Sequence, residues 1–463
     1  MAMREPVEVL DEEHEHLIGR VAAIDVAKAF GKVCTRIPHQ STSGRRVTKV
    51  WDVEATLNAV TELSDRLAEL GVEKVTVEST GDYWRIWYYV LEAQGLNVQL
   101  VNARDVKHLP GRSKTDKLDA VWLAKLTEKG LVRPSFVPPK EIRTLRDYTR
   151  MRSDLTVERT RYWLRLEKLL EDSLIKVSAV ASTLTTASIR DMIEALIAGE
   201  RDPRVLAEFA RGRMRAKIPA LVEALSGQFD DHHAELAALL LAQIDGLDVQ
   251  IGKLTARIEQ LLDDLPAARP DRASGDSGRD GDSSANPGDH PEITAASRPA
   301  LSAVERLDEI PGISPAVAQV ILAEVGLDMN RFPTAGHLVS WAKLCPRTIQ
   351  SGAKSPTGGR TGKGNPYLKG VLGQAAAVAA RTDSFLGERY RRIVKRRGKL
   401  KALVAVARSI LVIIWHLLAN PTTRYFDLGA DYHADRVDTG KKIRTYVRQL
   451  EALGLTVTLT SAA

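Results

Sequence analysis

The stretch GRVAAIDVAKAF (residues 19–30) decides how the N-terminal third of the chain is interpreted. It is apolar up to Asp25, and KVCTRIP and RVTKVWDVEA follow it at the spacing of hairpins. Short β-rich runs separated in this way predict three sequential strands. The strand that ends at Asp25 would be the first of them.

The next segments alternate between helix and strand. TLNAVTELSDRLAELG repeats leucine and valine at helical spacing and stops at Gly71, KVTVEST predicts a strand, DYWRIWYYVLEAQG a helix and NVQLVNA a strand. With the helix that follows, the order up to about Lys129 is βββαβαβα. This order predicts a mixed α/β domain.

Four acids fall where these elements begin or end. Asp25 and Glu78 each close an apolar strand, while GRSKTDKLDA (residues 111–120) places Asp116 and Asp119 at the start of the helix after the last strand. Acids in a first helical turn commonly act only as caps. Ligand sites of α/β sheets gather at strand ends, so we expect the four carboxylates to converge and to need two divalent cations. Oxygen ligands favour Mg²⁺ or Mn²⁺.

Composition narrows the class of partner and the compartment. Lys and Arg number 66 against 59 Asp and Glu, a formal charge of +7 that favours a polyanionic partner such as nucleic acid. The two cysteines make neither a disulfide framework nor a zinc site, and the acidic N-terminus lacks the apolar core of a signal peptide. We therefore predict a cytoplasmic protein.

One apolar segment raises the question of a membrane span. ALVAVARSILVIIWHLLA (residues 402–419) is long enough to cross a bilayer, but Arg408 would lie inside it at a cost of about 2.5 to 3.5 kcal/mol. The sequence favours a buried helix and no membrane partner.

The middle of the chain changes character. From Leu236 to Leu265 apolar residues recur mostly in alternating steps of four and three, which is a heptad seam. The seam fits a hairpin of helices within one chain as well as a coiled coil between chains. Residues 266–300 are rich in Gly, Ser, Pro and Asp, which predicts a flexible linker.

The C-terminal part indicates nucleic-acid binding. In LDEIPGISPAVAQVILAEVG (residues 307–326), Pro311 and Gly312 join two helical runs as in a helix-hairpin-helix, which presents backbone N–H groups to phosphate unless it serves packing alone. Residues 329–382 contain no Asp or Glu but eight Lys or Arg, and RRIVKRRGKLK (residues 391–401) adds seven cations. The candidate phosphate-binding residues are Lys354, Arg360, Lys363, Arg391, Arg392, Lys395, Arg396 and Arg397.

Several sequence motifs in the chain resemble those of one known family. The order Asp, Glu, Asp, Asp on a βββαβαβα frame resembles the RuvC-like branch of the ribonuclease H fold. AAIDVAK, VTVESTGDYW, VNARDVKHLPGRSKTDKLDAVWLAKL, LDEIPGISPAVAQVILAEVG and SWAKLCPRTIQSGAKSPTGGRTGKGNPYLKGVL together look like the DEDD transposases of insertion-sequence family one-ten, the bridge-RNA-guided serine recombinases. The resemblance covers residues 17 to about 150 and 300 to about 420.

The resemblance implies a domain plan and a nucleophile. It gives a RuvC-like DEDD domain at 17–150 and a mainly helical transposase domain at 301–420 with a helix-hairpin-helix-like motif. Periodicity and composition add a helical coiled-coil segment at 151–265 and a linker at 266–300, which leaves a tail at 421–463. The family's nucleophile corresponds to Ser351, the serine of the SG pair, with Ser355 nearby. No His lies close in sequence, so the metals of the four acids would activate the serine.

The implied function is a transposase that cuts and exchanges DNA strands through a phosphoserine link. Its partners would be donor and target DNA, a guide RNA and further copies of the chain, as a dimer or tetramer. Two alternatives stay open. One is a RuvC-like nuclease or junction resolvase that hydrolyses DNA with water, and the other is a basic nucleic-acid-binding protein without activity.

Overall fold

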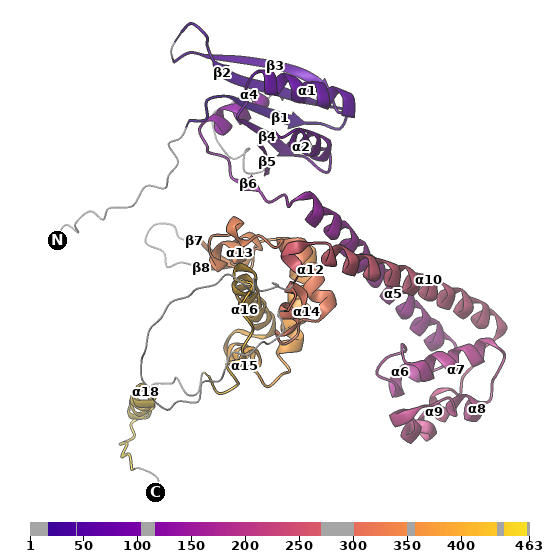
Figure 1. Ribbon diagram of the computed structural model, residues 1–463. Coiled ribbons are helices and arrows are strands. Elements are labelled where there is room, and N and C mark those ends of the chain that lie inside the picture. The colour runs from indigo at the N-terminus through magenta and orange to yellow at the C-terminus, as the bar shows by residue number, and fades with distance from the viewer. Residues whose placement is uncertain are drawn as a thin grey trace, which may run out of the picture. The chain divides into compact units, whose positions relative to one another are not determined.

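The computed structural model describes residues 17–42, 44–102, 116–269, 301–349, 357–432 and 439–460 (Figure 1). The chain divides into two compact units, Met1–Pro138 and Pro139–Ala463. Each unit is described by itself. The predicted linker at 266–300 falls outside the described residues after position 269, and a short helix, η2 (Pro266–Ala268), lies within its described start.

The first unit is a six-stranded mixed sheet with helices on both faces. Its strands lie in the order β3-β2-β1-β4-β5-β6; β1 pairs antiparallel with β2 and parallel with β4. The elements are β1 (Val21–Val26), β2 (Phe30–Pro38), β3 (Arg46–Glu54), α1 (Leu57–Glu69), β4 (Lys74–Ser79), α2 (Trp84–Ala93), β5 (Val98–Asn102), α4 (Asp116–Glu128) and β6 (Pro134–Ser135).

Alternation along the central strands gives the sheet two apolar faces. Ala22 and Ile24 of β1 belong to one core with α1 and α2, whereas Ala23 belongs to a second core with α4. The predicted order βββαβαβα is confirmed, and so is a mixed α/β domain consistent with a RuvC-like start. The sequence did not predict β6, because two residues are too short for a periodic signal.

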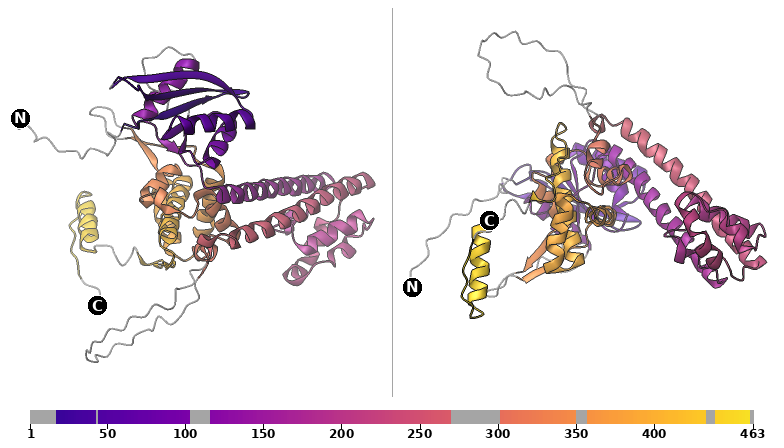
Figure 2. Two further views of the ribbon diagram at one scale, coloured as in Figure 1. Left: turned by 45° about the horizontal axis from the view of Figure 1, so that its top comes forward. Right: turned by 90° about the horizontal axis from the view of Figure 1, so that it is seen from below.

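A long arm begins the second unit. Two 33-residue helices, α5 (Lys140–Asp172) and α10 (Asp231–Asp263), lie side by side in both views of Figure 2. An ion pair between Arg159 and Asp248 joins them. The arm's tip, residues 173–230, contains α6 (Val177–Val180), α7 (Ala187–Ile197), α8 (Pro203–Ala207), η1 (Gly212–Lys217) and α9 (Ile218–Ala224).

The heptad seam of α10 faces its own chain. Ile244 and Ile258 are fully buried, while Leu247, Ile251 and Leu254 between them are half-buried. Of the two alternatives, the structure shows the hairpin of helices within one chain, with α5 as the partner of α10. Contact of the arm with a second chain stays a prediction.

The rest of the second unit is mainly helical. Its elements are α11 (Ala303–Asp308), α12 (Pro315–Val325), η3 (Met329–Arg331), α13 (Ala335–Trp341), β7 (Pro346–Ile349), β8 (Thr357–Thr361), α14 (Pro366–Ala379), α15 (Phe385–Arg397), α16 (Lys399–Ala419) and α18 (Thr439–Glu451). Among the described helices, α16 alone is long and apolar enough to cross a membrane. Its residues Val406, Ile410 and Ile414 lie in the core shared with α12 and α14, and Arg408 is exposed.

The two helical runs predicted around Pro311 and Gly312 are α11 and α12. Gly312 has a φ of +91°, and a Cβ there would lie 2.3 Å from the carbonyl oxygen of Ala375 in α14. Packing of the turn against α14 therefore requires glycine at this position. The expected contact with phosphate stays a prediction.

Candidate active site

Strand register brings two of the predicted acids to one edge of the sheet. The last pair between the parallel strands β1 and β4 is Ile24 with Val77, so Asp25 and Glu78 follow at the same end. Alternation sends both side chains to the face that α4 covers, because Ala23 packs against α4 and Thr76 contacts it. Two carboxylates therefore project beside the start of α4.

Polar contacts hold α4 on that face. The hydroxyls of Thr127 and Thr76 are 2.7 Å apart, and the Gln99 side-chain amide donates to the Thr76 hydroxyl at 2.7 Å. All three residues are buried. Glu128, at the end of the helix, receives Arg36 Nε at 2.8 Å and Arg46 Nε at 2.7 Å. These contacts fix α4 against β2, β3 and β4, and with it the acids at its other end.

Three of the four predicted acids line one pocket. Asp25, Glu78 and Asp119 surround a cavity of about 250 Å³, together with Lys32, whose ammonium pairs with Asp52. Asp116 is the first residue of α4, one helical turn before Asp119. The side chain of Asp116 lies outside what the structure describes.

The donor set suits a hard divalent cation. Every acid that lines the cavity offers oxygen, which Mg²⁺ and Mn²⁺ prefer. Glu78 is only 4% exposed, and a divalent cation in the cavity would add positive charge beside its carboxylate. Among the described residues, one grouping of potential ligand atoms within 4.8 Å of one another lies elsewhere. The cavity therefore fits the predicted metal site by the chemistry of its oxygen donors.

This other grouping is Asp230, His232 and His233 at the start of α10. The backbone N–H of Asp230 donates to His233 Nδ1 at 3.1 Å, as part of a capping box. A neutral His233 ring that accepts at Nδ1 carries its proton on Nε2, so neither ring nitrogen has a lone pair left for a metal. Helix capping accounts for this grouping.

The predicted nucleophile lies in sequence between two paired strands of the second unit. Strands β7 and β8 pair antiparallel, from Pro346 with Thr361 to Ile349 with Thr357. Ser351, Lys354 and Ser355 fall between these strands in sequence and lie outside the described residues, as does the side chain of Arg360. Lys363, just after β8, is exposed.

A buried glutamate, which sequence reasoning missed, ties this hairpin to the arm. Glu324 of α12 has no exposed surface. Arg150 of α5 binds its carboxylate in a bidentate manner, at 2.7 and 2.9 Å, and Arg146 Nε lies 3.3 Å from it. The Nδ2 of Asn365, four residues after β8, donates to Glu324 Oε2 at 2.5 Å. One carboxylate thus connects α5, α12 and the end of the hairpin.

The residues after β8 are fixed by further contacts. The Asn365 side chain caps α14 by accepting from the backbone N–H of Tyr367 and Leu368. The Tyr367 hydroxyl donates to Asp154 of α5 at 3.0 Å, and Arg150 stacks over its ring at 4.9 Å. Burial, together with Asp154, raises the pKa of Tyr367. Gly364 has a φ of +61°, and a Cβ there would lie 2.7 Å from the Ala342 carbonyl oxygen.

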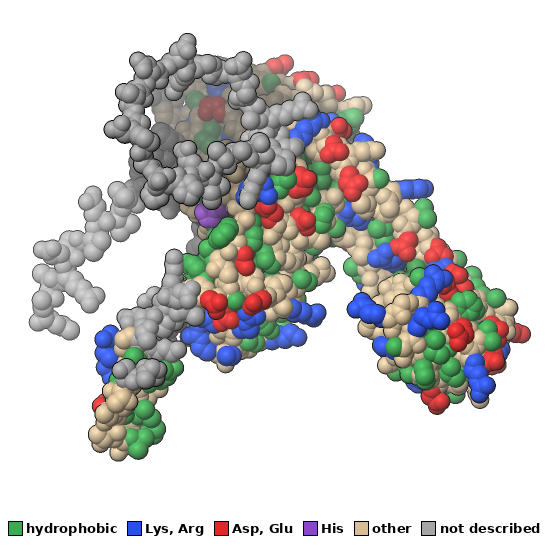
Figure 3. All heavy atoms as spheres, turned by 60° about the horizontal axis from the view of Figure 1, so that its bottom comes forward, with side chains coloured by type: hydrophobic (Ala, Val, Ile, Leu, Met, Phe, Trp, Pro, Cys, Tyr) green, Lys and Arg blue, Asp and Glu red, His purple; other side chains and the backbone are tan. Residues whose placement is uncertain are grey.

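The basic stretch at 391–401 forms the end of α15 and the start of α16. Arg392, Lys395, Arg396 and Arg397 are exposed, while Arg391 is half-buried and pairs with Glu388 at 2.8 Å. Figure 3 shows Lys and Arg side chains gathered along one edge of this part of the unit. The exposed guanidinium and ammonium groups can contact phosphates, because most of them keep their solvent-facing donors.

Comparison with known proteins finds two family models that match the chain. A family model for DEDD transposases of the IS110 type, described as "Transposase", matches residues 22–175. A second, described as "Transposase IS116/IS110/IS902 family", matches residues 304–391. The first match contains Asp25, Glu78, Asp116 and Asp119, and the second contains Ser351.

Individual relatives support the same assignment. The chain is 25% identical over 361 residues to the "Transposase for insertion sequence element IS1111A" of Coxiella burnetii, which covers 77% of this chain and 80% of that protein. It is 33% identical over 118 residues to the "Insertion element IS110 uncharacterized 43.6 kDa protein" of Streptomyces coelicolor, covering 25% of this chain and 29% of that protein. With an acid-lined pocket on a mixed sheet and a basic helical region in the places that the two models cover, the chain belongs to the IS110 family of DEDD transposases.

Proposed function

We propose that this transposase cuts and exchanges DNA strands with two sets of groups, the carboxylates of the first unit and Ser351 of the second. The observation that carries the proposal is the convergence of Asp25, Glu78 and Asp119 on one cavity. The acid-free, cation-rich stretch around Ser351 supports it, because such a stretch suits a phosphate backbone.

The four acids would hold the divalent metal that a DEDD transposase needs, most simply Mg²⁺ or Mn²⁺. When bound, such a metal polarises a phosphate oxygen and lowers the pKa of an attacking hydroxyl. The chain's own part is to keep Asp25, Glu78 and Asp119 at fixed places through strand register and the seating of α4. Asp116 would complete the set from the first turn of that helix.

Ser351 would supply the nucleophile. Its hydroxyl oxygen forms a bond to the scissile phosphorus, the bond from phosphorus to one strand's sugar oxygen breaks, and the serine proton leaves with the departing hydroxyl. The product is a DNA strand joined to the protein as a phosphoserine ester. Attack by the sugar hydroxyl of another strand reverses these steps and joins the new pair.

Nucleic-acid contact would come from the basic residues near the serine and on α15. Lys354, Arg360 and Lys363 flank the serine in sequence, and α15 presents its exposed cations. We extend the proposal to a guide RNA that selects donor and target DNA, to association of at least two copies through the arm, and to action in the cytoplasm. Light scattering of the protein with and without nucleic acid measures the assembly.

Single substitutions test the two sets of groups. Glu78→Gln and Asp25→Asn should lower strand cleavage by about a thousandfold or more and spare most DNA binding, because they remove metal ligands and not phosphate contacts. Ser351→Ala should also abolish cleavage, and only proteins that keep the serine should yield a DNA adduct that survives denaturation. Ser355→Ala and Glu54→Gln, which removes an acid at another strand end, are the matched controls.

One outcome replaces the proposal with the rival nuclease. A Ser351→Ala protein that still cuts DNA, without any adduct, would show that water is the nucleophile. Normal strand cleavage by the Glu78→Gln and Asp25→Asn variants would contradict the proposed metal site. A wild type that binds nucleic acid and never cuts it, with either metal, would leave the non-enzymatic binding protein.

A further inference from the structure

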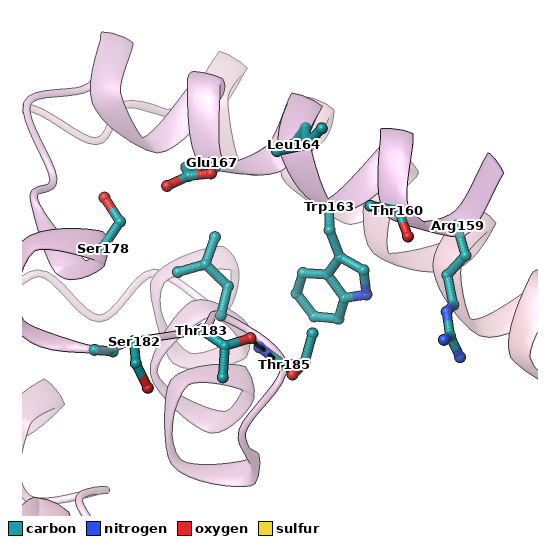
Figure 4. A pocket seen from close by; sticks show the side chains of 11 residues that line it. Arg159, Thr160, Trp163, Leu164, Glu167, Ser178, Ser182, Thr183 and Thr185 are labelled. Atoms are coloured by element: carbon teal, nitrogen blue, oxygen red, sulfur yellow. Dashed lines mark hydrogen bonds between the residues drawn. The ribbon is translucent and has the colours of Figure 1, made fainter. Parts of the chain in front are cut away.

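The tip of the arm contains a pocket that neither set of catalytic groups uses. Its volume is about 320 Å³, and it lies between α5 and the loop that joins α6 to α7. In Figure 4 the indole of Trp163 points from α5 toward the loop segment that carries Thr183 and Thr185. Arg159 stands at one end of the pocket, and Glu167 and Ser178 stand at the other.

The lining combines one large aromatic ring with many hydroxyl groups. The hydroxyls come from Thr160, Ser178, Ser182, Thr183 and Thr185. Thr183 and Thr185 are exposed, and their hydroxyls are 2.9 Å apart. The Thr160 hydroxyl donates to the Thr156 carbonyl oxygen at 2.9 Å and the Ser178 hydroxyl to Glu171 at 3.3 Å, so both hydroxyl oxygens keep lone pairs that can accept from a ligand. A planar group with hydrogen-bonding edges satisfies both the ring and the hydroxyls, and the volume lies at the small end of ligand sites.

Trp163 is placed to stack on such a group. It is half-buried at the edge of the tip's core. The ring of the neighbouring Tyr162 is already in contact with a cation, because the guanidinium of Arg165 lies over it, 4.7 Å from the ring centre. Within the described part of the chain, no such cation lies over Trp163 and no aromatic ring stacks on it. Bases stack on aromatic side chains of this kind when a nucleic-acid strand is unpaired.

A basic segment runs beside the same loop. Residues 201–217 contain six Lys or Arg against two acids, and Arg204, Arg213 and Arg215 are exposed. Lys217 Nζ donates to the carbonyl oxygen of Val180 at 2.7 Å, next to the pocket's Ala181 and Ser182. Figure 3 shows Lys and Arg side chains at this end of the arm. Phosphates that flank a bound base would meet these cations.

We propose that the pocket at the arm's tip binds an unpaired nucleotide of a nucleic-acid strand, whose base stacks on Trp163. The hydroxyls of Thr183 and Thr185 bond the edge of the base, and the basic segment 201–217 holds the adjoining phosphates. The inference rests on the proposed function, because it takes nucleic acid to be the transposase's substrate. It adds a second nucleic-acid contact, distant from Ser351 in sequence, that distinguishes an unpaired nucleotide from a paired one.

Binding measurements on the full-length protein test the proposal. The probes are two duplexes that differ by one unpaired nucleotide, each made as RNA and as DNA, with fluorescence anisotropy as the readout. The wild type should bind the duplex with the unpaired nucleotide about tenfold more tightly in at least one of the two chemistries, a preference within the range of one base–aromatic stack. Trp163→Leu should reduce that preference to near one, whereas Tyr162→Leu should keep it.

A milder variant guards against misfolding of the tip. Thr183 and Thr185 are exposed, so a double change to alanine leaves the core intact and should lower the preference severalfold. An iodouracil at the unpaired position should cross-link, by mass spectrometry, to the peptide that contains Trp163. Equal binding of the paired and unpaired duplexes by the wild type, or cross-links confined to the C-terminal part, would overturn the inference.

The failure of this inference is distinguishable from the failure of the proposed function. If only the pocket is misassigned, both duplexes still bind and binding still falls with salt. If nucleic acid is not the substrate, neither duplex binds, and strand cleavage is absent as well.

Discussion

The acid pocket of the first unit and the serine hairpin of the second are held in place by different forces. Asp25 and Glu78 stand where strand register puts them, between two apolar faces of one sheet. The end of the hairpin is instead attached to α5 and α12 through a buried cluster of charges around Glu324. The first site is therefore a product of local periodicity, and the second depends on contacts between distant segments.

The largest expected effect is a difference in alkylation rate between the two cysteines, of which Cys34 lies in the first unit and Cys345 in the second. Cys34 lies in β2 on the α4 face of the sheet and is fully buried, and burial raises the pKa of its thiol to about 12, against the lowering by Arg36 and Lys125. Since the thiolate is the form that reacts, only a very small fraction of Cys34 is reactive at pH 8. Cys345, just before β7, is half-buried.

Alkylation with iodoacetamide, followed by mass spectrometry, should label Cys345 at least about a hundredfold faster than Cys34. In guanidinium chloride the two rates should become similar, which is the control for accessibility. Equal rates in the native protein would mean that β2 opens readily, and the contrast between a rigid pocket and a more accessible hairpin would not hold.

The sequence predicted the first site more fully than the second for a physical reason. Apolar runs that end in Asp25 and Glu78, and a helix that starts at Asp116, are short-range patterns, and alternation alone sets the side of the sheet. Glu324 sits in a helical run with no local mark, and its partners Arg146 and Arg150 are more than 170 residues away. The one available signal was an acid inside a helix, PAVAQVILAEV, whose other residues are apolar except for Gln319.

The role of α10 shows the same limit. The heptad seam was evident in the sequence, but periodicity does not choose the partner helix, and α5 proved to be that partner within the chain. The tip pocket had no sequence signal, because Trp163 and Thr183 come together only when the loop after α6 folds against α5.

Removing the charge of Glu324 should have the next largest effect. Glu324→Gln leaves the guanidinium groups of Arg146 and Arg150 without their buried counter-charge, which should lower the free energy of unfolding by roughly 3 kcal/mol. The surface pair of Glu388 with Arg391 offers the control, since Glu388→Gln should cost under about 1 kcal/mol. Urea denaturation followed by circular dichroism measures both.

A second measurement tests whether Glu324 positions the hairpin of β7 and β8 or only stabilises the fold in general. At temperatures where the Glu324→Gln protein is still folded, adduct formation at Ser351 should fall further than DNA binding does. Nearly unchanged stability in Glu324→Gln would show that the charge cluster contributes little to the second unit, and the comparison between the two regions would lose its basis.

The next prediction tests the acid pocket of the first unit through its response to a metal ion. At a hundredfold excess over its dissociation constant, Mn²⁺ should stabilise the folded protein by about 2.7 kcal/mol, because only the folded pocket gathers the acids. Glu78→Gln should lose this stabilisation, because it removes one of the carboxylate ligands that line the cavity. Calorimetry with and without Mn²⁺ gives both values, and Glu54→Gln should respond to the metal like the wild type.

The smallest expected effect concerns the hydrogen bond that helps to hold α4 against the sheet. Thr127→Val removes the hydroxyl that links the helix to Thr76 and to the Leu123 carbonyl oxygen, which should cost about 1 kcal/mol of stability. Thr61→Val is the matched control, because the Thr61 hydroxyl bonds only to Leu57 of its own helix at 2.9 Å, and its loss should cost a few tenths of a kcal/mol. If the hydroxyl of Thr127 positions Asp119, the variant should also bind Mn²⁺ several-fold more weakly in the same calorimetric experiment. Unchanged metal affinity with the stability loss would mean that the apolar face of α4, with Leu123 and Ala124, sets the position of the helix unaided.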